Sequence, residues 1–213
     1  MSKPKDVTAS RLQGFVSPPH GIPSLVDCKT NAELIAAAHA LGYVGERVLD
    51  LSYGHGEFWT IHRPPALVAN DLNPDKGEHH NDVAGSPPVE WHDAFDTVVW
   101  DGPYRLNGTP NRGVFDEKFG TDEPQRLRDR LNLLLLGVVF ASRCVRPGGH
   151  VLVKCQDQVA AGRKQQQRRM IQDTGELFGL KWIDELHMRV AVRRQRSQKL
   201  SRSNFSTLVV FTG

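Results

Sequence analysis

The sequence predicts a single α/β domain with a mostly parallel, seven-stranded sheet and helices on both faces. Short apolar runs alternate along the chain with segments of helical period, an order typical of parallel sheets. Several of these runs end at Asp, Asn or Gly, as strands do before a turn. The length of 213 residues suits one domain of this kind and leaves little room for a second.

Seven apolar runs are predicted strands. They lie at 47–50, 66–69, near Val89, and at 96–100, 150–154, 182–187 and 206–211. Helices are predicted over 31–41, 125–145 and 165–177. Thr30 is the expected N-cap of the first helix, with Glu33 three residues later completing a capping box.

Three segments without apolar period flank or interrupt these elements. Residues 1–24 carry four prolines and are expected to form a flexible arm before the domain of residues 25–213. Residues 105–124 are rich in Gly, Asn and Pro and follow a strand directly, so they are the expected active-site loop. A basic loop over 188–204 joins the last two strands.

Composition narrows the class of protein. No apolar run is long enough to cross a membrane and the N-terminus has no signal pattern, so a soluble, cytoplasmic protein without a membrane partner is expected. Cys28, Cys144 and Cys155 lie far apart, which predicts reduced, mostly buried thiols and no zinc site. The pair His79-His80 near Asp82 is interpreted as solvated, and no metal is expected.

Charge is distributed unevenly along the chain. Residues 1–125 hold 10 Lys and Arg against 18 Asp and Glu, whereas residues 126–213 hold 17 against 6. A strongly basic half favours a polyanionic partner, because cations that neutralise phosphates release counterions. A solvated basic face would have the same composition, so charge alone does not identify a nucleic-acid binder.

Acidic and glycine residues follow the first two predicted strands. Asp50 ends the first strand, and Gly54 and Gly56 lie in the turn after it. Glycine allows the backbone to approach a nucleotide-like ligand closely. Asp71, about twenty residues on at the end of the next strand, is placed to accept bonds from ribose hydroxyls. Asp82 is a third acid in the series.

The segment from Phe95 to Tyr104 contains the residues that we expect to hold and orient a substrate amine. An apolar strand delivers Asp101, a proline-stiffened turn and the ring of Tyr104 to one edge of the sheet. Methylating an amine requires acceptors that hold its N–H bonds and direct its lone pair; Asp101 and the carbonyl of Gly102 can be these acceptors. Tyr104 can stack on a base, which contributes roughly 1–3 kcal/mol.

Asp101-Gly-Pro-Tyr104 resembles the D-P-P-Y signature of amino-group DNA methyltransferases, and Asp50 to Gly56 is similar to their cofactor turn. The segments 147–149, 152–157 and 203–211 resemble small methylase-like proteins of bacteria and their phages. The resemblance covers roughly residues 28–213. It implies a Rossmann-like class I methyltransferase domain that uses S-adenosyl-L-methionine.

The resemblance also implies roles for individual residues. Asp101, Pro103 and Tyr104 would be catalytic. The cofactor would contact Lys29, Thr30, Asp50, Leu51, Ser52, Tyr53, Gly54, Gly56, Asp71, Leu72 and Asp82. Within this set Asp50, Gly54 and Gly56 would hold the methionine part, Asp71 the ribose and Asp82 the adenine. Two departures from the family stand out: Gly102 replaces the first proline of the motif, and no target-recognition domain of the usual size is present.

These observations predict a site-specific DNA methyltransferase acting on the exocyclic amine of adenine, or of cytosine. Its DNA would be single-stranded or would have the target base flipped out of the duplex. The expected DNA-binding residues are Arg105, Arg112, Arg193, Arg194, Arg196, Lys199 and Arg202. The oligomeric state is left open.

Other functions remain open at this stage. RNA is an alternative substrate, methylated on a base amine or on a ribose hydroxyl. For ribose methylation, Lys29, Asp101 and Lys154 match three of four family residues, but the last predicted strand has no carboxylate for the fourth. Because of Gly102, a non-catalytic nucleic-acid-binding module is the further alternative.

Overall fold

The computed structural model describes residues 28–104, 106, 127–190 and 199–213. The predicted arm 1–24, nearly all of the predicted loop 105–124 and the centre of the basic loop therefore lie outside the described residues. The same holds for five predicted DNA-binding residues. These are Arg105, Arg112, Arg193, Arg194 and Arg196.

Six strands form the main sheet in the order β2-β1-β3-β4-β8-β7. Their bounds are β1 Arg47–Asp50, β2 Ala66–Ala69, β3 Phe95–Trp100, β4 Val145–Cys155, β7 Lys181–Arg189 and β8 Phe205–Thr212. The first four strands pair in parallel, and β8 pairs antiparallel with both of its neighbours. The predicted mostly parallel sheet is thus confirmed. A separate hairpin comprises β5 (Gln158–Ala160) and β6 (Arg163–Gln165).

The predicted strand near Val89 is wrong. Val89–Trp91 forms the 3₁₀ helix η3, so the sheet has six strands rather than seven among the described residues. Two consecutive prolines, Pro87 and Pro88, precede it and lack the N–H groups that a strand ladder needs. Val89 is 86% exposed, and the apolar burial of this segment comes from Trp91, which packs edge-on against Phe95.

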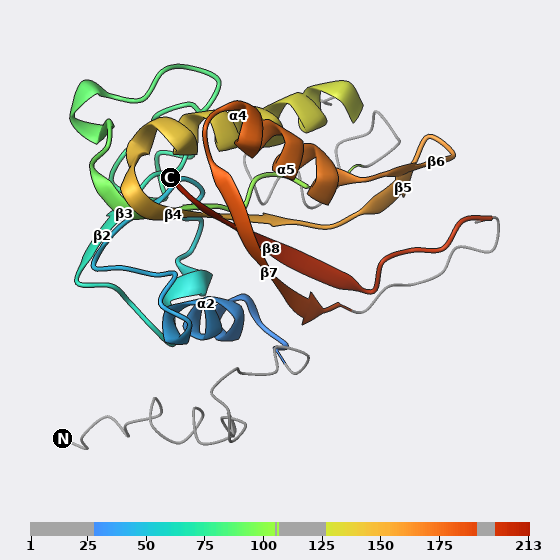
Figure 1. Cartoon of the computed structure of the whole chain (residues 1–213), viewed down its shortest axis with the longest axis horizontal. Helices are drawn as coiled ribbons and strands as arrows, with labels where there is room; N and C mark the ends of the chain where they lie inside the picture. Colours follow the sequence, from blue (N-terminus) through green and yellow to red (C-terminus); the bar gives the residue numbers. More distant parts are fainter. Residues whose placement is uncertain (1–27, 105, 107–126, 191–198) are drawn as a thin grey trace.

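Helices cover both faces of the sheet, as predicted. Figure 1 shows α2 (Asn31–Ala40) on one side and α4 (Leu127–Cys144) with α5 (Gln167–Leu177) on the other. Two apolar clusters correspond to the two faces: one gathers Leu34 and Ile35 of α2, the other Leu134 and Val138 of α4. The central strands β1, β3, β4 and β8 are therefore largely buried, which explains their apolar runs, whereas the edge strands β2 and β7 are partly exposed.

The start of α2 follows the predicted capping pattern in part. Thr30 Oγ1 accepts the Glu33 backbone N–H at 3.2 Å, while a Glu33 carboxylate oxygen accepts the Lys29 backbone N–H at 2.7 Å. Thr30 is therefore the N-cap as predicted, whereas Glu33 bonds the residue before the cap and not the cap itself, so the capping box is formed only in part.

Cys28, Cys144 and Cys155 are all buried and unbridged. Among the described helices, none is long and apolar enough to cross a bilayer. The strand ends matter most for function, because the carboxyl ends of the parallel strands β1, β2 and β3 meet at one edge of the sheet.

Candidate active site

Asp50 stabilises the turn after β1 through two hydrogen bonds. Its buried carboxylate accepts the Ser52 backbone N–H at 2.9 Å and the Trp59 indole N–H at 2.7 Å. Burial raises the pKa of Asp50 to about 7, although both hydrogen bonds favour the ionised form. Gly54 and Gly56 have φ of 58° and 69°, in the left-handed region that favours glycine.

Asp71 joins this turn to the end of β2. Its Oδ2 accepts the Gly54 backbone N–H at 2.8 Å, and its Oδ1 accepts the Asn73 backbone N–H at 2.9 Å. Each carboxylate oxygen can accept two hydrogen bonds. Asp71 therefore braces the glycine turn and retains the capacity to accept two more donors from a ligand.

A buried amide fixes the opposite wall. Asn70 Oδ1 accepts the Asn81 backbone N–H at 2.8 Å, and its Nδ2 donates to the carbonyls of Leu51 and Asn81, at 3.3 and 3.0 Å. The segment that brings Asn81 and Val83 to the site is thereby hydrogen-bonded to the strand ends.

The turn after β3 lies beside the glycine turn. The Asp101 backbone N–H donates to Ser52 Oγ at 2.9 Å, which bonds the two strand ends directly. The Tyr104 N–H donates to the Gly102 carbonyl at 2.7 Å. The Gly102 carbonyl, predicted to accept from a substrate amine, thus already accepts one hydrogen bond within its own turn.

The structure explains why glycine stands at position 102. A Cβ added there would lie 2.4 Å from the Trp100 ring, and one added at Gly137 of α4 would lie 2.2 Å from the same ring. Trp100 is held in place by its indole N–H, which donates to the Leu134 carbonyl at 3.0 Å. A large ring therefore occupies the space that a proline at position 102 would need.

Lys154, on β4, connects the turn after β3 to the sheet. Its Nζ lies 3.4 Å from Asp101 Oδ2 and 3.4 Å from Tyr104 Oη, and it lies over the Phe58 ring at 5.5 Å. Burial disfavours the ammonium, but Asp101 and Tyr104 outweigh it and raise the pKa of Lys154. Burial also raises the pKa of Asp101, with Lys154 opposing the shift. Asp101 Oδ1 is buried and accepts no hydrogen bond from the described residues.

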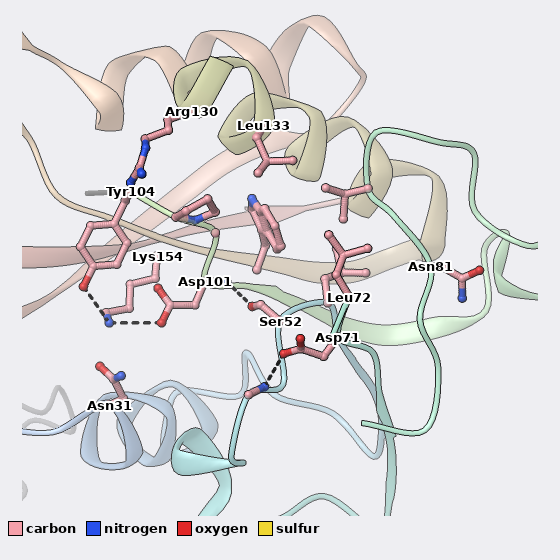
Figure 2. Close-up of a pocket in the computed structure, with 16 residues that line it drawn as sticks. Asn31, Ser52, Asp71, Leu72, Asn81, Asp101, Tyr104, Arg130, Leu133 and Lys154 are labelled. Carbon is pink, nitrogen blue, oxygen red and sulfur yellow. Dashed lines mark hydrogen bonds and ion pairs between the residues drawn. The ribbon is translucent and has the colours of Figure 1, made fainter. Parts of the chain in front are cut away.

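These elements enclose one cavity of about 210 Å³ (Figure 2). Figure 2 shows Asp101 and Tyr104 on the same side of it as Lys154, with Ser52 and Asp71 facing them. The lining residues are Asn31, Leu51, Ser52, Gly54, Asp71, Leu72, Asn81, Val83, Trp100, Asp101, Gly102, Pro103, Tyr104, Arg130, Leu133 and Lys154. The lining thus combines apolar side chains with acids, amides and the two cations Arg130 and Lys154.

The cavity brings together all three predicted catalytic residues and about half of the predicted cofactor residues. Those that line it are Asp101, Pro103, Tyr104, Leu51, Ser52, Gly54, Asp71 and Leu72. Lys29, Thr30, Asp50, Tyr53, Gly56 and Asp82 are not among the lining residues. Of these, Asp50 is hydrogen-bonded to the backbone of the turn after β1. Asp82 Oδ1 accepts the Ala84 N–H at 2.9 Å within its own loop.

Several lining residues were absent from the predicted site. Arg130 is 4% exposed and lies on the same face of α4 as Leu134, four residues on. A cation at a helix position that the apolar pattern predicts to be buried could have marked Arg130 as a site residue. Lys154 was considered only for ribose methylation. Asn31 directly follows the N-cap Thr30, and Asn81 lies in a loop. No sequence pattern marks either residue as part of a binding site.

Two of the predicted DNA-binding residues, Lys199 and Arg202, are described, and both are exposed. No cluster of three or more His, Cys, Asp or Glu side chains in the described ranges is placed to hold a metal ion. His79 packs edge-on against Trp91, and His80 contacts the Asp71 carbonyl through Nδ1.

No family model matches this chain, and no curated protein matches it. Among solved structures, the N-methyltransferase NodS from Bradyrhizobium japonicum is 12% identical, with 85% of this chain and 93% of that chain covered, at a TM-score of 0.50. TTHA0409 of Thermus thermophilus, a candidate DNA modification methylase, is 14% identical at a TM-score of 0.37. TTHA0409 has also been solved in complex with S-adenosyl-L-methionine.

The likeness to NodS shows the fold. The described part of the chain has the mixed α/β architecture of Rossmann-like methyltransferases, with helices on both faces of a mostly parallel sheet. The alignment with TTHA0409 covers 79% of this chain but only 53% of that one, so this chain spans about half the length of that protein.

Proposed function

We propose that this chain is an S-adenosyl-L-methionine-dependent methyltransferase that acts on the exocyclic amine of adenine, or of cytosine, at specific sites in DNA. The observation that carries the proposal is the meeting of Asp101 and Tyr104 with the glycine turn in one cavity. Asp101 Oδ1 is buried there with no partner among the described residues. A buried acceptor without a donor is costly, and a substrate N–H would satisfy it.

The residues present fit the cofactor. Gly54 lines the cavity, and a Cβ built on it would have only the Ser52 carbonyl as a neighbour, at 3.9 Å, so a ligand can lie close to the backbone. Asp71 has acceptor capacity for ribose hydroxyls, while Leu72, Val83 and Leu133 offer apolar surface to a flat ring. We assign Ser52 and Gly54 to the methionine part and Asp71 to the ribose. When bound, S-adenosyl-L-methionine supplies an electrophilic methyl group.

The chain's own groups would orient the amine. Asp101 accepts one N–H and so turns the nitrogen lone pair toward the methyl group, while the Tyr104 ring stacks on the base. Transfer would form an N–C bond in place of the donor's S–C bond, and the amine would then lose one proton, which the Asp101 carboxylate would receive and pass to solvent. Lys154 is a positioning residue here, because its charge opposes the rise in the Asp101 pKa that burial causes, and its ammonium holds one of the Asp101 oxygens.

Ribose-hydroxyl methylation in RNA is the second candidate, and the Lys154–Asp101 pair favours it. These two side chains are half of the four-residue set that such enzymes use. β8 would have to provide the acid, yet Phe205–Thr212 contains no carboxylate. Lys29, the remaining member, is exposed and does not line the cavity. Amine methylation therefore has the better support.

Labelled cofactor tests the proposal. The full chain is incubated with methyl-labelled S-adenosyl-L-methionine and double-stranded DNA, single-stranded DNA or RNA, and the products are digested to nucleosides. We expect N6-methyladenine or N4-methylcytosine from DNA. Asp101→Ala should abolish transfer and retain cofactor binding, whereas Asp75→Ala, at an exposed loop acid, should leave both unchanged. Label on ribose, label in RNA alone, or full turnover by Asp101→Ala would contradict the proposal.

A further inference from the structure

A second hollow lies near the turn after β3, residues 101–104, and we call it the α5 groove. Its volume is about 560 Å³. Residues of the β5–β6 hairpin, the first turn of α5 and the chain entering β8 line it. Its lining includes Gln158, Lys164, Arg168, Arg169, Arg202 and Phe205. In Figure 1 the hairpin, the start of α5 and the end of β7 all lie at one end of the molecule, to which β4 points.

The groove is cationic. Its lining carries four Lys and Arg side chains against two carboxylates, those of Asp157 and Asp173. Arg169 pairs with Asp173 at 3.7 Å, but both side chains are more than two-thirds exposed, so this ion pair is weak. Arg168 is bound more firmly, at 2.9 Å from Glu185. Lys164 and Arg169 are thus two exposed cations of the lining that can meet an anion from solvent.

An aromatic ring stands among these cations. Phe205, at the start of β8, is 39% exposed and contacts His187 edge-on at 4.9 Å between ring centroids. Cationic grooves with exposed aromatic rings are typical of single-stranded nucleic-acid binding, because phosphates meet the charges and bases stack on the rings. Glutamine and serine side chains in the same lining suit sugar and phosphate oxygens.

Hydrogen bonds connect the groove to the candidate active site. Gln158 Oε1 accepts the Leu106 backbone N–H at 3.0 Å, two residues after Tyr104. The buried Gln167 at the start of α5 donates its Nε2–H to the Tyr104 carbonyl at 2.7 Å. At the far wall, Gln156 Nε2 donates to the Ser203 carbonyl at 3.2 Å. The groove therefore shares its framework with the turn that would hold the target base.

We propose that the α5 groove binds the single-stranded DNA that flanks the target base, with Lys164 and Arg169 on its phosphates and Phe205 against a neighbouring base. This inference rests on the proposed function. It adds a surface to the basic loop that the sequence indicated, and it places the bound strand next to the turn after β3, to which Gln158 and Gln167 are hydrogen-bonded.

The test measures the affinity of the full chain for a labelled single-stranded oligonucleotide by fluorescence anisotropy, at several salt concentrations. K164Q/R169Q should bind more weakly, and the slope of log K against log salt should become shallower by roughly 0.7 for each cation removed. Phe205→Leu should weaken binding roughly 5-fold or more with little change in slope. R143Q/K181Q removes the same charge at the opposite edge of the sheet and should preserve the slope.

The outcomes separate the two proposals. If the wild-type chain methylates DNA and K164Q/R169Q keeps the wild-type slope, the groove assignment is wrong and the proposed function stands. An equal slope change in R143Q/K181Q would also overturn the assignment, because net charge alone would explain it. If the slope changes for RNA and not for DNA, the assigned partner is wrong. If the wild-type chain neither binds nor methylates DNA, both proposals fall.

Discussion

Lys154 Nζ lies 3.4 Å from Asp101 Oδ2, and the lysine side chain is only 3% exposed. A buried cation beside a carboxylate at a strand end does more than stabilise the fold, because it influences which protonation state that carboxylate adopts. In the proposed reaction, one oxygen of Asp101 would be occupied by the ammonium and the other would remain for a substrate donor.

Lys154→Met should impair transfer through the charge of Asp101. Burial raises the pKa of Asp101 and Lys154 lowers it, so removing the lysine raises this pKa further. A higher pH is then needed to ionise the acid. We expect turnover at pH 7 to fall about 10-fold or more and to recover partly as the pH rises. The measurement is the pH–rate profile of the variant and of the wild type. If activity falls on the acidic side at the same pH in both proteins, the role assigned to Lys154 is wrong.

Asp71→Asn should weaken cofactor binding, because an amide offers one acceptor where Asp71 offers two. The amide NH₂ would also meet the Gly54 or Asn73 N–H that the carboxylate now accepts. We expect about a 10-fold or larger increase in Kd for S-adenosyl-L-methionine by calorimetry, since a charge-assisted hydrogen bond contributes about 1.5–3 kcal/mol. Asp75→Asn is the control. Unchanged affinity in Asp71→Asn would remove Asp71 from the cofactor site.

Trp59→Phe should destabilise the protein more at pH 8 than at pH 5. The indole N–H donates to Asp50, whose pKa is raised to about 7, so the acid is ionised at pH 8 and protonated at pH 5. Losing the donor costs about 1–3 kcal/mol when the carboxylate is charged and less when it is neutral. The loss of stability caused by Trp59→Phe therefore grows as the pH rises through 7 and Asp50 ionises.

Urea denaturation at the two pH values measures the effect of Trp59→Phe. Trp182→Phe provides the control, because that indole donates to the backbone carbonyl of Asp184, which does not titrate. A Trp59→Phe penalty that is equal at both pH values would mean that Asp50 does not titrate between them.

Gly102→Ala should destabilise the fold because its Cβ would lie 2.4 Å from the Trp100 ring. Overpacking of this kind costs about 1–3 kcal/mol. In a Trp100→Leu background the ring is gone, and the same substitution should cost much less. A double-mutant cycle in urea tests this coupling. Additive effects would show that Trp100 is not the reason for glycine at this position.

Much of the sheet could be predicted because most strands contain a short apolar run, and β1, β2 and β3 end at or just before a polar residue. The strands at 47–50 and 66–69 have the predicted bounds, and β3 and β4 are one and six residues longer than predicted. The predicted strand near Val89 is wrong because a valine two residues before a tryptophan looks like an apolar run, although only Trp91 is buried. The β5–β6 hairpin was missed because its strands are three residues long and polar.

The candidate site could be predicted only where function leaves a local pattern. Asp101 to Tyr104 and Ser52 to Gly54 follow strands and carry recognisable turn residues, and the cavity brings them together. Lys154 and Arg130 come from β4 and α4, 50 and 26 residues beyond Tyr104 in the chain, and their proximity depends on strand order and helix packing. The space taken by the Trp100 ring is likewise a tertiary property, so the reason for Gly102 could not be read from the motif.

The position of Trp100 makes the cavity optically observable. Of the four tryptophans, Trp100 lines the cavity, whereas Trp59, Trp91 and Trp182 do not. Its indole is fixed to the Leu134 carbonyl, so its emission should respond to what enters beside it and little to motion of the ring itself. Intrinsic fluorescence of the unlabelled chain, with Trp100→Phe as the blank, therefore gives a direct reporter of occupancy, independent of any assumption about which reaction follows.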